Sequence, residues 1–179
     1  MTPHSLEQPQ NSRPPAAREK FRVCVAKESF IFCSGHFISY EGDKCERLHG
    51  HNYRTAVEIE GELDVNYYVF DFIALKHVTR AITDELDHRM MLPTRNDLIR
   101  VEEGPRSVHV RYRDREWLFP RGDCVLLPIE NTTAELLARY IGGRLLEELQ
   151  ARHHFTPQVL RVEVEESVGQ SATYEWRGA

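Results

Sequence analysis

Two histidines in this sequence have a spacing that suits metal binding. His49 and His51 lie in a segment whose apolar and polar residues alternate, so both imidazoles point to the apolar face of a predicted strand. A buried imidazole without a partner is costly, and a shared metal ion would satisfy both rings. Zn²⁺ binds neutral imidazole nitrogen, and three protein ligands with one open position form a catalytic site. His36, at the end of an earlier extended segment, could supply the third ligand. Taken alone, such a pair is more often polar or packing histidines.

A cysteine and an Asp–His pair could carry proton transfers at such a site. Cys45 lies four residues before His49 in an expected loop, where a nearby zinc ion would favour the thiolate. Asp87 and His88 close the first expected helix, and a carboxylate there can set the protonation state of the imidazole. Both features also have interpretations that involve no catalysis. Cys45 can be an ordinary loop cysteine, and His88 can complement the dipole at a helix end.

A carboxylate interrupts the apolar face of a late strand. Leu160, Val162 and Val164 alternate on one face, and Glu166 takes the next position on it. One interpretation is a frayed strand end where the pattern breaks. The other is a carboxylate at a buried edge that awaits hydrogen-bond donors from a ligand.

The elements that must position these residues are mostly strands. Residues 21–36 predict either a first strand pair or one long bent strand, and residues 39–48 predict a charged loop. Clear alternation follows over residues 49–60. Residues 158–166 and 172–176 predict two further strands at the end of the chain.

Two helices are expected between these strands. The first covers residues 71–86, with apolar side chains three and four positions apart. The second begins where Thr132 and Glu135 have capping-box spacing, and it runs to about residue 150. Two adjacent glycines in its middle each weaken it by about 1 kcal/mol relative to alanine. The order of elements predicts an α+β fold, a mostly antiparallel sheet with both helices on one face.

The sequence divides into a tail and one domain. Residues 1–19 are rich in Pro, Gln, Ser, Asn and Arg and predict a disordered tail. Residues 20–179 predict a single domain, within which residues 93–128 form an inserted region with a hairpin over residues 107–119. This inserted region follows the Asp–His pair almost directly.

Composition excludes several classes of protein. The chain has 179 residues, 41% of them hydrophobic, and a net charge of −5 without a basic stripe, which argues against a nucleic-acid partner. Its apolar runs fall far short of the roughly 20 residues of a membrane span, and no secretory signal is visible. The four cysteines form no C-x-x-C pair, so reduced thiols in a cytoplasm are expected.

Six segments, in the right order, resemble the 6-pyruvoyl-tetrahydropterin synthase and 6-carboxy-tetrahydropterin synthase family. The most specific is Cys45–Tyr53, which resembles the signature C-x-x-L-H-G-H-x-Y/F. The others are Phe32–His36 for F-S-A-x-H, Val69–Lys76 for V-x-D-F-x-x-L-K, Leu86–His88 for L-D-H, Thr133–Glu135 for T-S/T-E, and Val162–Ser167 for V-x-V-x-E-S/T. The resemblance runs from about residue 20 to the end. It departs at Gly35, where alanine or serine is usual, and at the inserted region.

The resemblance implies a fold and a set of roles. The fold would be the tunnelling fold, in which the sheets of several subunits close into a barrel, usually as a homohexamer with active sites between subunits. Zinc would be held by His36, His49 and His51. Cys45 would be the general base, Asp87 and His88 a proton relay from a neighbouring subunit, and Glu166 the anchor of the pterin ring with Thr133 near it.

The resemblance also implies a reaction. The short spacing between Cys45 and His49 favours the carboxy-forming branch, a zinc-dependent lyase that converts 7,8-dihydroneopterin triphosphate to 6-carboxy-5,6,7,8-tetrahydropterin in queuosine and deazapurine synthesis. The alternatives are a 6-pyruvoyl-tetrahydropterin synthase, a related enzyme with another pterin substrate, and a non-catalytic protein that binds zinc and pterin. A closed structural zinc site is a further alternative, in which Cys45 would be the fourth ligand.

Overall fold

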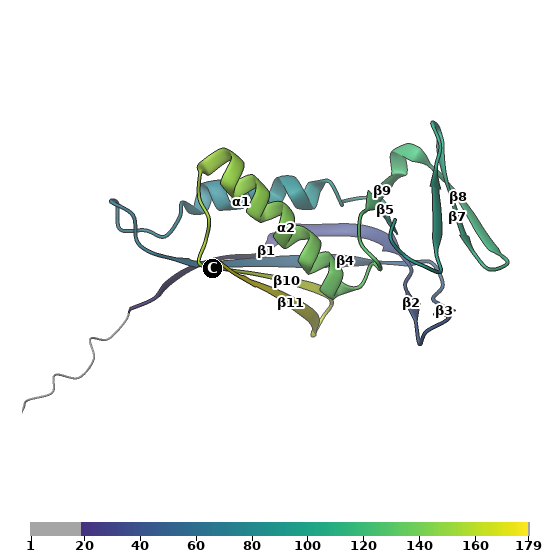
Figure 1. Ribbon diagram of the computed structural model, residues 1–179, viewed down its shortest axis with the longest axis horizontal. Helices are drawn as coiled ribbons and strands as arrows, with labels where there is room; N and C mark the ends of the chain where they lie inside the picture. The colour runs from purple at the N-terminus through teal and green to yellow at the C-terminus, as the bar shows by residue number, and fades with distance from the viewer. Residues whose placement is uncertain (1–18, 179) are drawn as a thin grey trace, which may run out of the picture.

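The computed structural model describes residues 19–178, so nearly all of the expected tail lies outside the described residues. Within this range, one six-stranded sheet carries two helices on a single face (Figure 1). The strand order is β11-β10-β4-β1-β5-β9. The bounds are β1 Phe21–His36, β4 His49–Gly61, β5 Arg89–Pro93, β9 Cys124–Leu127, β10 Val159–Ser167, β11 Gln170–Arg177, α1 Phe72–Asp84 and α2 Ala134–His153. The α+β prediction is confirmed.

Strands β1 and β4 form the long antiparallel pair on which the site is built. Their register runs from Phe21 opposite Gly61 to His36 opposite His49, with one irregularity between Ala26 and Ile31. Residues 21–36 therefore form one long strand and not a strand pair. Alternation places Val57 and Ile59 in the core with no exposed surface, beneath the helices.

The helices begin and end near the expected residues, with two corrections. The carboxylate of Asp71 caps α1 by accepting from the amide of Ala74 at 2.7 Å. Helix α1 ends at Asp84, so the Asp–His pair lies beyond the helix and not at its last turn. The capping box expected from Thr132 is wrong by one residue, because Thr133 is the N-cap of α2 and accepts from the amide of Leu136.

One of the two adjacent glycines in α2 has a packing role. A Cβ on Gly142 would lie 2.7 Å from Cδ1 of Tyr174 on β11, whereas a Cβ on Gly143 would meet nothing within 4 Å. Only glycine lets the helix approach the sheet this closely at position 142. The helix-propensity cost expected at both glycines is therefore accompanied, at Gly142, by a packing requirement for glycine.

The region expected as an insertion contributes to two sheets. Strand β5 pairs in parallel with β1 and with β9, so the main sheet is antiparallel on one side and parallel on the other. In the sequence between β5 and β9, the chain forms a three-stranded antiparallel sheet that stands beyond the end of the main sheet (Figure 1). Its strands are β6 Arg100–Glu103, β7 Ser107–Tyr112 and β8 Arg115–Pro120, followed by the 3-10 turn η1 Arg121–Asp123. The expected hairpin is confirmed as β7–β8, with β6 as an additional strand.

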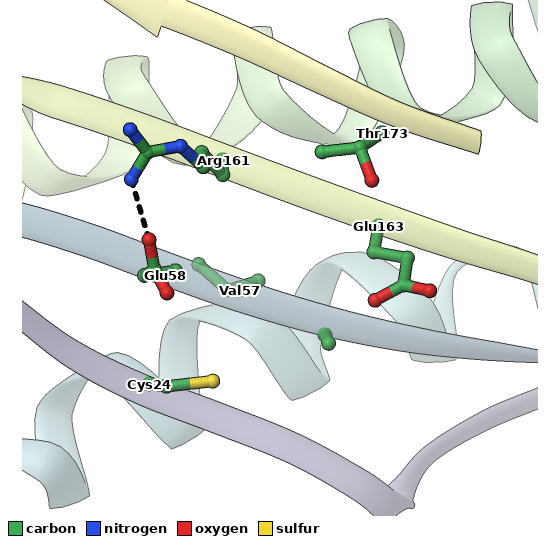
Figure 2. Close-up of a pocket in the computed structure, with 7 residues that line it drawn as sticks. Cys24, Val57, Glu58, Arg161, Glu163 and Thr173 are labelled. Carbon is green, nitrogen blue, oxygen red and sulfur yellow. Dashed lines mark hydrogen bonds and ion pairs between the residues drawn. The ribbon is translucent and has the colours of Figure 1, made fainter. Parts of the chain in front are cut away.

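The sheet face away from the helices is polar. Figure 2 shows this face, with Arg161 of β10 reaching Glu58 of β4 across a shallow hollow of about 200 Å³ that Cys24 also lines. Arg161 also bonds Glu60 and Glu175, which holds the pKa of Glu60 below its usual range. These ion pairs tie three neighbouring strands together on a surface that holds none of the expected site residues. Neither helix in the described part of the chain is long and apolar enough to cross a bilayer.

Candidate active site

The strand register brings the three expected metal ligands together. His36 is paired with His49, and His51 is paired with Ser34 two residues earlier on β1. One ring nitrogen from each of His36, His49 and His51 lies within 4.8 Å of the others. The spacing in the sequence and the β1–β4 ladder thus produce a cluster of three imidazoles that could hold a metal ion.

Backbone carbonyls orient two of these imidazoles. Nδ1 of His36 lies 3.0 Å from the carbonyl oxygen of Thr132, and Nδ1 of His49 lies 2.8 Å from that of Arg47. A carbonyl can only accept, so each Nδ1 carries a proton, and the neutral tautomer that these carbonyls favour leaves Nε2 free to bind an ion. A backbone carbonyl on the ring nitrogen away from the ion is typical of histidines that ligate a metal.

The state of His36 fits a metal ligand. Its Nε2 is buried and has no hydrogen-bond partner among the described residues. Burial lowers the pKa of His36 to about 4, and the neighbouring rings of His49 and His51 act in the same direction. The ring is therefore neutral near pH 7, as zinc requires, and an ion would satisfy the unpartnered nitrogen.

Glu166 lies directly beside the histidine cluster. Its Oε1 is 3.4 Å from Nε2 of His36 and 3.6 Å from Nε2 of His51. The buried hydroxyl of Tyr53 donates to the same oxygen at 3.4 Å, and burial together with this carboxylate raises the pKa of Tyr53. Glu166 and Thr133 line a common hollow of about 350 Å³. Both residues expected to contact a ligand therefore line one hollow, and Glu166 also lies beside the histidine cluster.

Cys45 lies in the short β2–β3 ribbon (Ser39–Tyr40 and Lys44–Cys45). Its half-buried thiol is 3.8 Å from Nη2 of Arg115 on β8. Burial raises the pKa of the Cys45 thiol, Arg115 opposes this rise, and Glu46 adds to it.

The Asp–His pair is formed as expected. Oδ2 of Asp87 lies 2.8 Å from Nδ1 of His88, and Oδ1 accepts from the amide of Cys33 at 2.7 Å. These bonds, led by the amide of Cys33, hold the pKa of Asp87 below its usual range. His88 is largely exposed and lines a hollow of about 480 Å³ together with His49. Within residues 19–178, no hydrogen bond or ion pair joins this pair to Cys45.

Two residues beside the site were not expected from the sequence. Oε2 of Glu46 lies 3.9 Å from Nε2 of His49, three residues later in the chain. Its place next to Cys45 in the signature segment could have indicated it. Arg115 contacts Cys45 from 70 residues away, and no local pattern in the sequence indicates such a contact.

This fold and this site define the class of protein: an α+β protein in which three histidines that could hold a metal ion lie beside a carboxylate-lined hollow. The chain belongs to the 6-pyruvoyl tetrahydropterin synthase family, whose family model matches residues 25–177.

Relatives and solved structures agree with this assignment. A protein of Methanocaldococcus jannaschii, provisionally named 6-carboxy-5,6,7,8-tetrahydropterin synthase, is 32% identical over 144 residues, which is 80% of this chain and 88% of the relative. The 6-carboxy-5,6,7,8-tetrahydropterin synthase of Haemophilus influenzae is 30% identical over 131 residues, covering 70% and 84%. The crystal structure of 6-pyruvoyl tetrahydropterin synthase from Plasmodium vivax superposes with a TM-score of 0.81 at 32% identity, covering 89% of this chain and 99% of that one.

Proposed function

We propose that this protein is a zinc-dependent lyase that converts 7,8-dihydroneopterin triphosphate to 6-carboxy-5,6,7,8-tetrahydropterin. Family membership makes the chain an enzyme of pterin chemistry. The observation that carries the finer assignment is the cluster of three histidines with Glu166 beside it. The relatives from Methanocaldococcus jannaschii and Haemophilus influenzae are both named for the carboxy-forming reaction, which supports this branch.

The metal would be held by the Nε2 atoms of His36 and His49 together with a ring nitrogen of His51. When bound, zinc supplies Lewis-acid polarisation of an oxygen on the substrate. Thr132 and Arg47 keep the protons of His36 and His49 on Nδ1, so these two ligands need no rearrangement to bind an ion.

The remaining residues would bind the substrate and move protons. The carboxylate oxygens of Glu166 can accept two N–H donors from the guanidine-like edge of a pterin, with Thr133 lining the same hollow. Sγ of Cys45 would accept a proton from the substrate side chain once ionised. Asp87 fixes the proton of His88 on Nδ1, which leaves Nε2 to give or take a proton.

The position of the Asp–His pair supports an assembly of several copies. The pair is formed and exposed, yet within the described chain it contacts neither Cys45 nor Glu166. A neighbouring copy could place its own pair opposite Cys45. The edge strands β9 and β11 of the described sheet offer unpaired backbone groups through which sheets of several copies could join into a barrel.

The test is incubation of the purified protein with 7,8-dihydroneopterin triphosphate and identification of the products by mass spectrometry. The expected products are a carboxylated tetrahydropterin, acetaldehyde and inorganic triphosphate, with one water consumed. Retention of the pterin without turnover would instead indicate a protein that binds zinc and pterin. Cys45→Ala should keep its metal content and lose turnover. Activity that survives in this variant would refute the assignment of the base.

A second candidate is formation of the 6-pyruvoyl product by triphosphate elimination. The similarity to the Plasmodium vivax structure, which is named for that reaction, favours it. The same mass spectrum separates the two reactions, because a pyruvoyl product retains the three-carbon side chain and releases no acetaldehyde. Glu46 gives the site a second possible base, so Glu46→Gln should be assayed beside Cys45→Ala for both products.

A further inference from the structure

The three-stranded sheet β6–β8 packs against the segment that carries Cys45. A second apolar cluster lies between this sheet and the end of the main sheet, with Phe37 and Val110 buried in it. The rings of Phe37 and Trp117 stack with centroids 4.5 Å apart. The Cys45 side chain packs against the same cluster. The inserted region therefore packs directly on the segment that carries Cys45 and is not a separate surface hairpin.

Arg115 is the residue through which the inserted sheet touches the segment directly. Its Nη1 donates to the carbonyl of Cys45 at 3.0 Å, and its Nη2 donates to the carbonyl of Glu46 at 2.6 Å. Nη2 also lies 3.8 Å from Sγ of Cys45. One guanidinium group thus contacts two successive carbonyls and the thiol, which a lysine ammonium cannot do with the same planar geometry.

Aromatic rings hold this guanidinium in place. Its Cζ lies 4.7 Å from the centroid of Trp117 and 5.6 Å from that of Tyr112. The hydroxyl of Tyr112 in turn donates to the carbonyl of Asp43, in the turn of the β2–β3 ribbon that carries Cys45. Arg115 is therefore held in place by its own sheet, and its N–H groups donate hydrogen bonds to the segment that carries the thiol.

The charges that face the thiol give this contact a chemical consequence. Arg115 from β8 and Glu46 from the same segment are the charged groups that act on Cys45, and they act in opposite directions. Without the guanidinium, the thiol would keep the burial and the carboxylate that disfavour its ionised form. A cysteine that acts as a base must first lose its own proton, and a neighbouring cation such as the guanidinium favours the resulting thiolate.

We propose that Arg115 is a positioning residue that fixes the Cys45 segment and favours the thiolate of Cys45. The inference rests on the proposed role of Cys45 as the base, and it gives the inserted sheet a part in the reaction. Arg113 offers a matched control on the same hairpin. It is exposed, and its ion pair with Oδ2 of Asp43 at 2.6 Å reaches the same segment without touching the thiol.

The experiment measures alkylation of Cys45 by iodoacetamide as a function of pH, with peptide mass spectrometry to separate it from the exposed Cys24 and Cys33. Wild type, Arg115→Gln, Arg115→Lys and Arg113→Gln are compared after circular dichroism shows that each is folded. Arg115→Gln should move the midpoint of the alkylation profile to higher pH and lower kcat about tenfold, with KM little changed. Arg115→Lys should restore part of the alkylation rate but not the full kcat, and Arg113→Gln should match wild type.

An alkylation profile of Arg115→Gln that coincides with wild type would overturn the inference. A shift of equal size in Arg113→Gln would overturn it too, because any change in the hairpin would then suffice. If Arg115→Gln fails to fold, the test rests on Arg115→Lys. A kcat and an alkylation profile equal to those of wild type in Arg115→Lys would then refute the need for the planar guanidinium group. The alkylation readout needs no turnover, so an active Cys45→Ala variant would refute the proposed base while a shifted profile still supports the contact.

Discussion

Lowering the pH should destabilise the metal-free protein through His36 by an amount that the structure defines. His36 is 1% exposed, and burial lowers its pKa to about 4, whereas the same side chain in an unfolded chain titrates near 6.5. Between these values the unfolded state binds more protons than the folded state. The free energy of unfolding therefore falls as the pH decreases from about 6.5 towards 4, and it is unaffected by His36 above about pH 7.

The magnitude follows from the two pKa values. Their full difference corresponds to about 3 kcal/mol, all of it lost below pH 4, and about 2 kcal/mol is lost between pH 7 and pH 5. That loss is a large part of the stability of an ordinary domain, which is about 5–15 kcal/mol. It should be visible as a lower urea midpoint.

The assay is urea unfolding of chelator-treated protein at pH 7 and pH 5. His36→Asn retains an amide donor for the carbonyl of Thr132 but does not titrate, so it should lose about 2 kcal/mol less than wild type between the two pH values. His77→Gln, which replaces an exposed histidine on α1, serves as the control and should follow wild type. Equal losses in His36→Asn and wild type would refute the conclusion that burial keeps His36 neutral.

Three further comparisons test the site and the packing of α2 on the sheet. His51→Ala removes one expected ligand and should lower the zinc content measured by plasma mass spectrometry; a wild-type zinc content would exclude His51 as a ligand. Glu166→Gln removes a charged acceptor and should raise the pterin Kd about 10- to 100-fold in calorimetry, so an unchanged Kd would contradict its anchoring role. Gly142→Ala should lower the free energy of unfolding by about 1–3 kcal/mol through the clash with Tyr174. Gly143→Ala should raise it by up to about 1 kcal/mol, and equal effects of the two changes would contradict the packing argument.

The centre of the fold could be predicted from the sequence because its strands are amphipathic. In β4 the alternation of side chains places His49 and His51 on the face that carries the core residues Val57 and Ile59. The antiparallel partner strand then brings His36 opposite His49. The α+β class and the gathering of the three histidines follow from this pattern.

The rest could not be predicted because its pattern is not local. Strand β5 is five residues long and four of them are buried, so it shows no alternation that would separate it from a loop or a helix end. Its parallel pairing with β1 was therefore missed. The cap of α2 was misplaced by one residue, since Thr132 and Thr133 are both suitable and only the structure shows which hydroxyl accepts the amide. The contact of Arg115 with Cys45 depends on how a separate sheet docks.

The placement of the histidines on two adjacent strands has a consequence for the order in which the protein matures. The expected ligands span only residues 36–51, and a loop this short closes at little entropic cost. Glu166, by contrast, meets Tyr53 across 113 residues of chain and only after β10 has docked. A nascent chain that has formed only β1 and β4 could already bring the three expected ligands together, whereas Glu166, the proposed anchor of the substrate, joins them only after the C-terminal strands have formed.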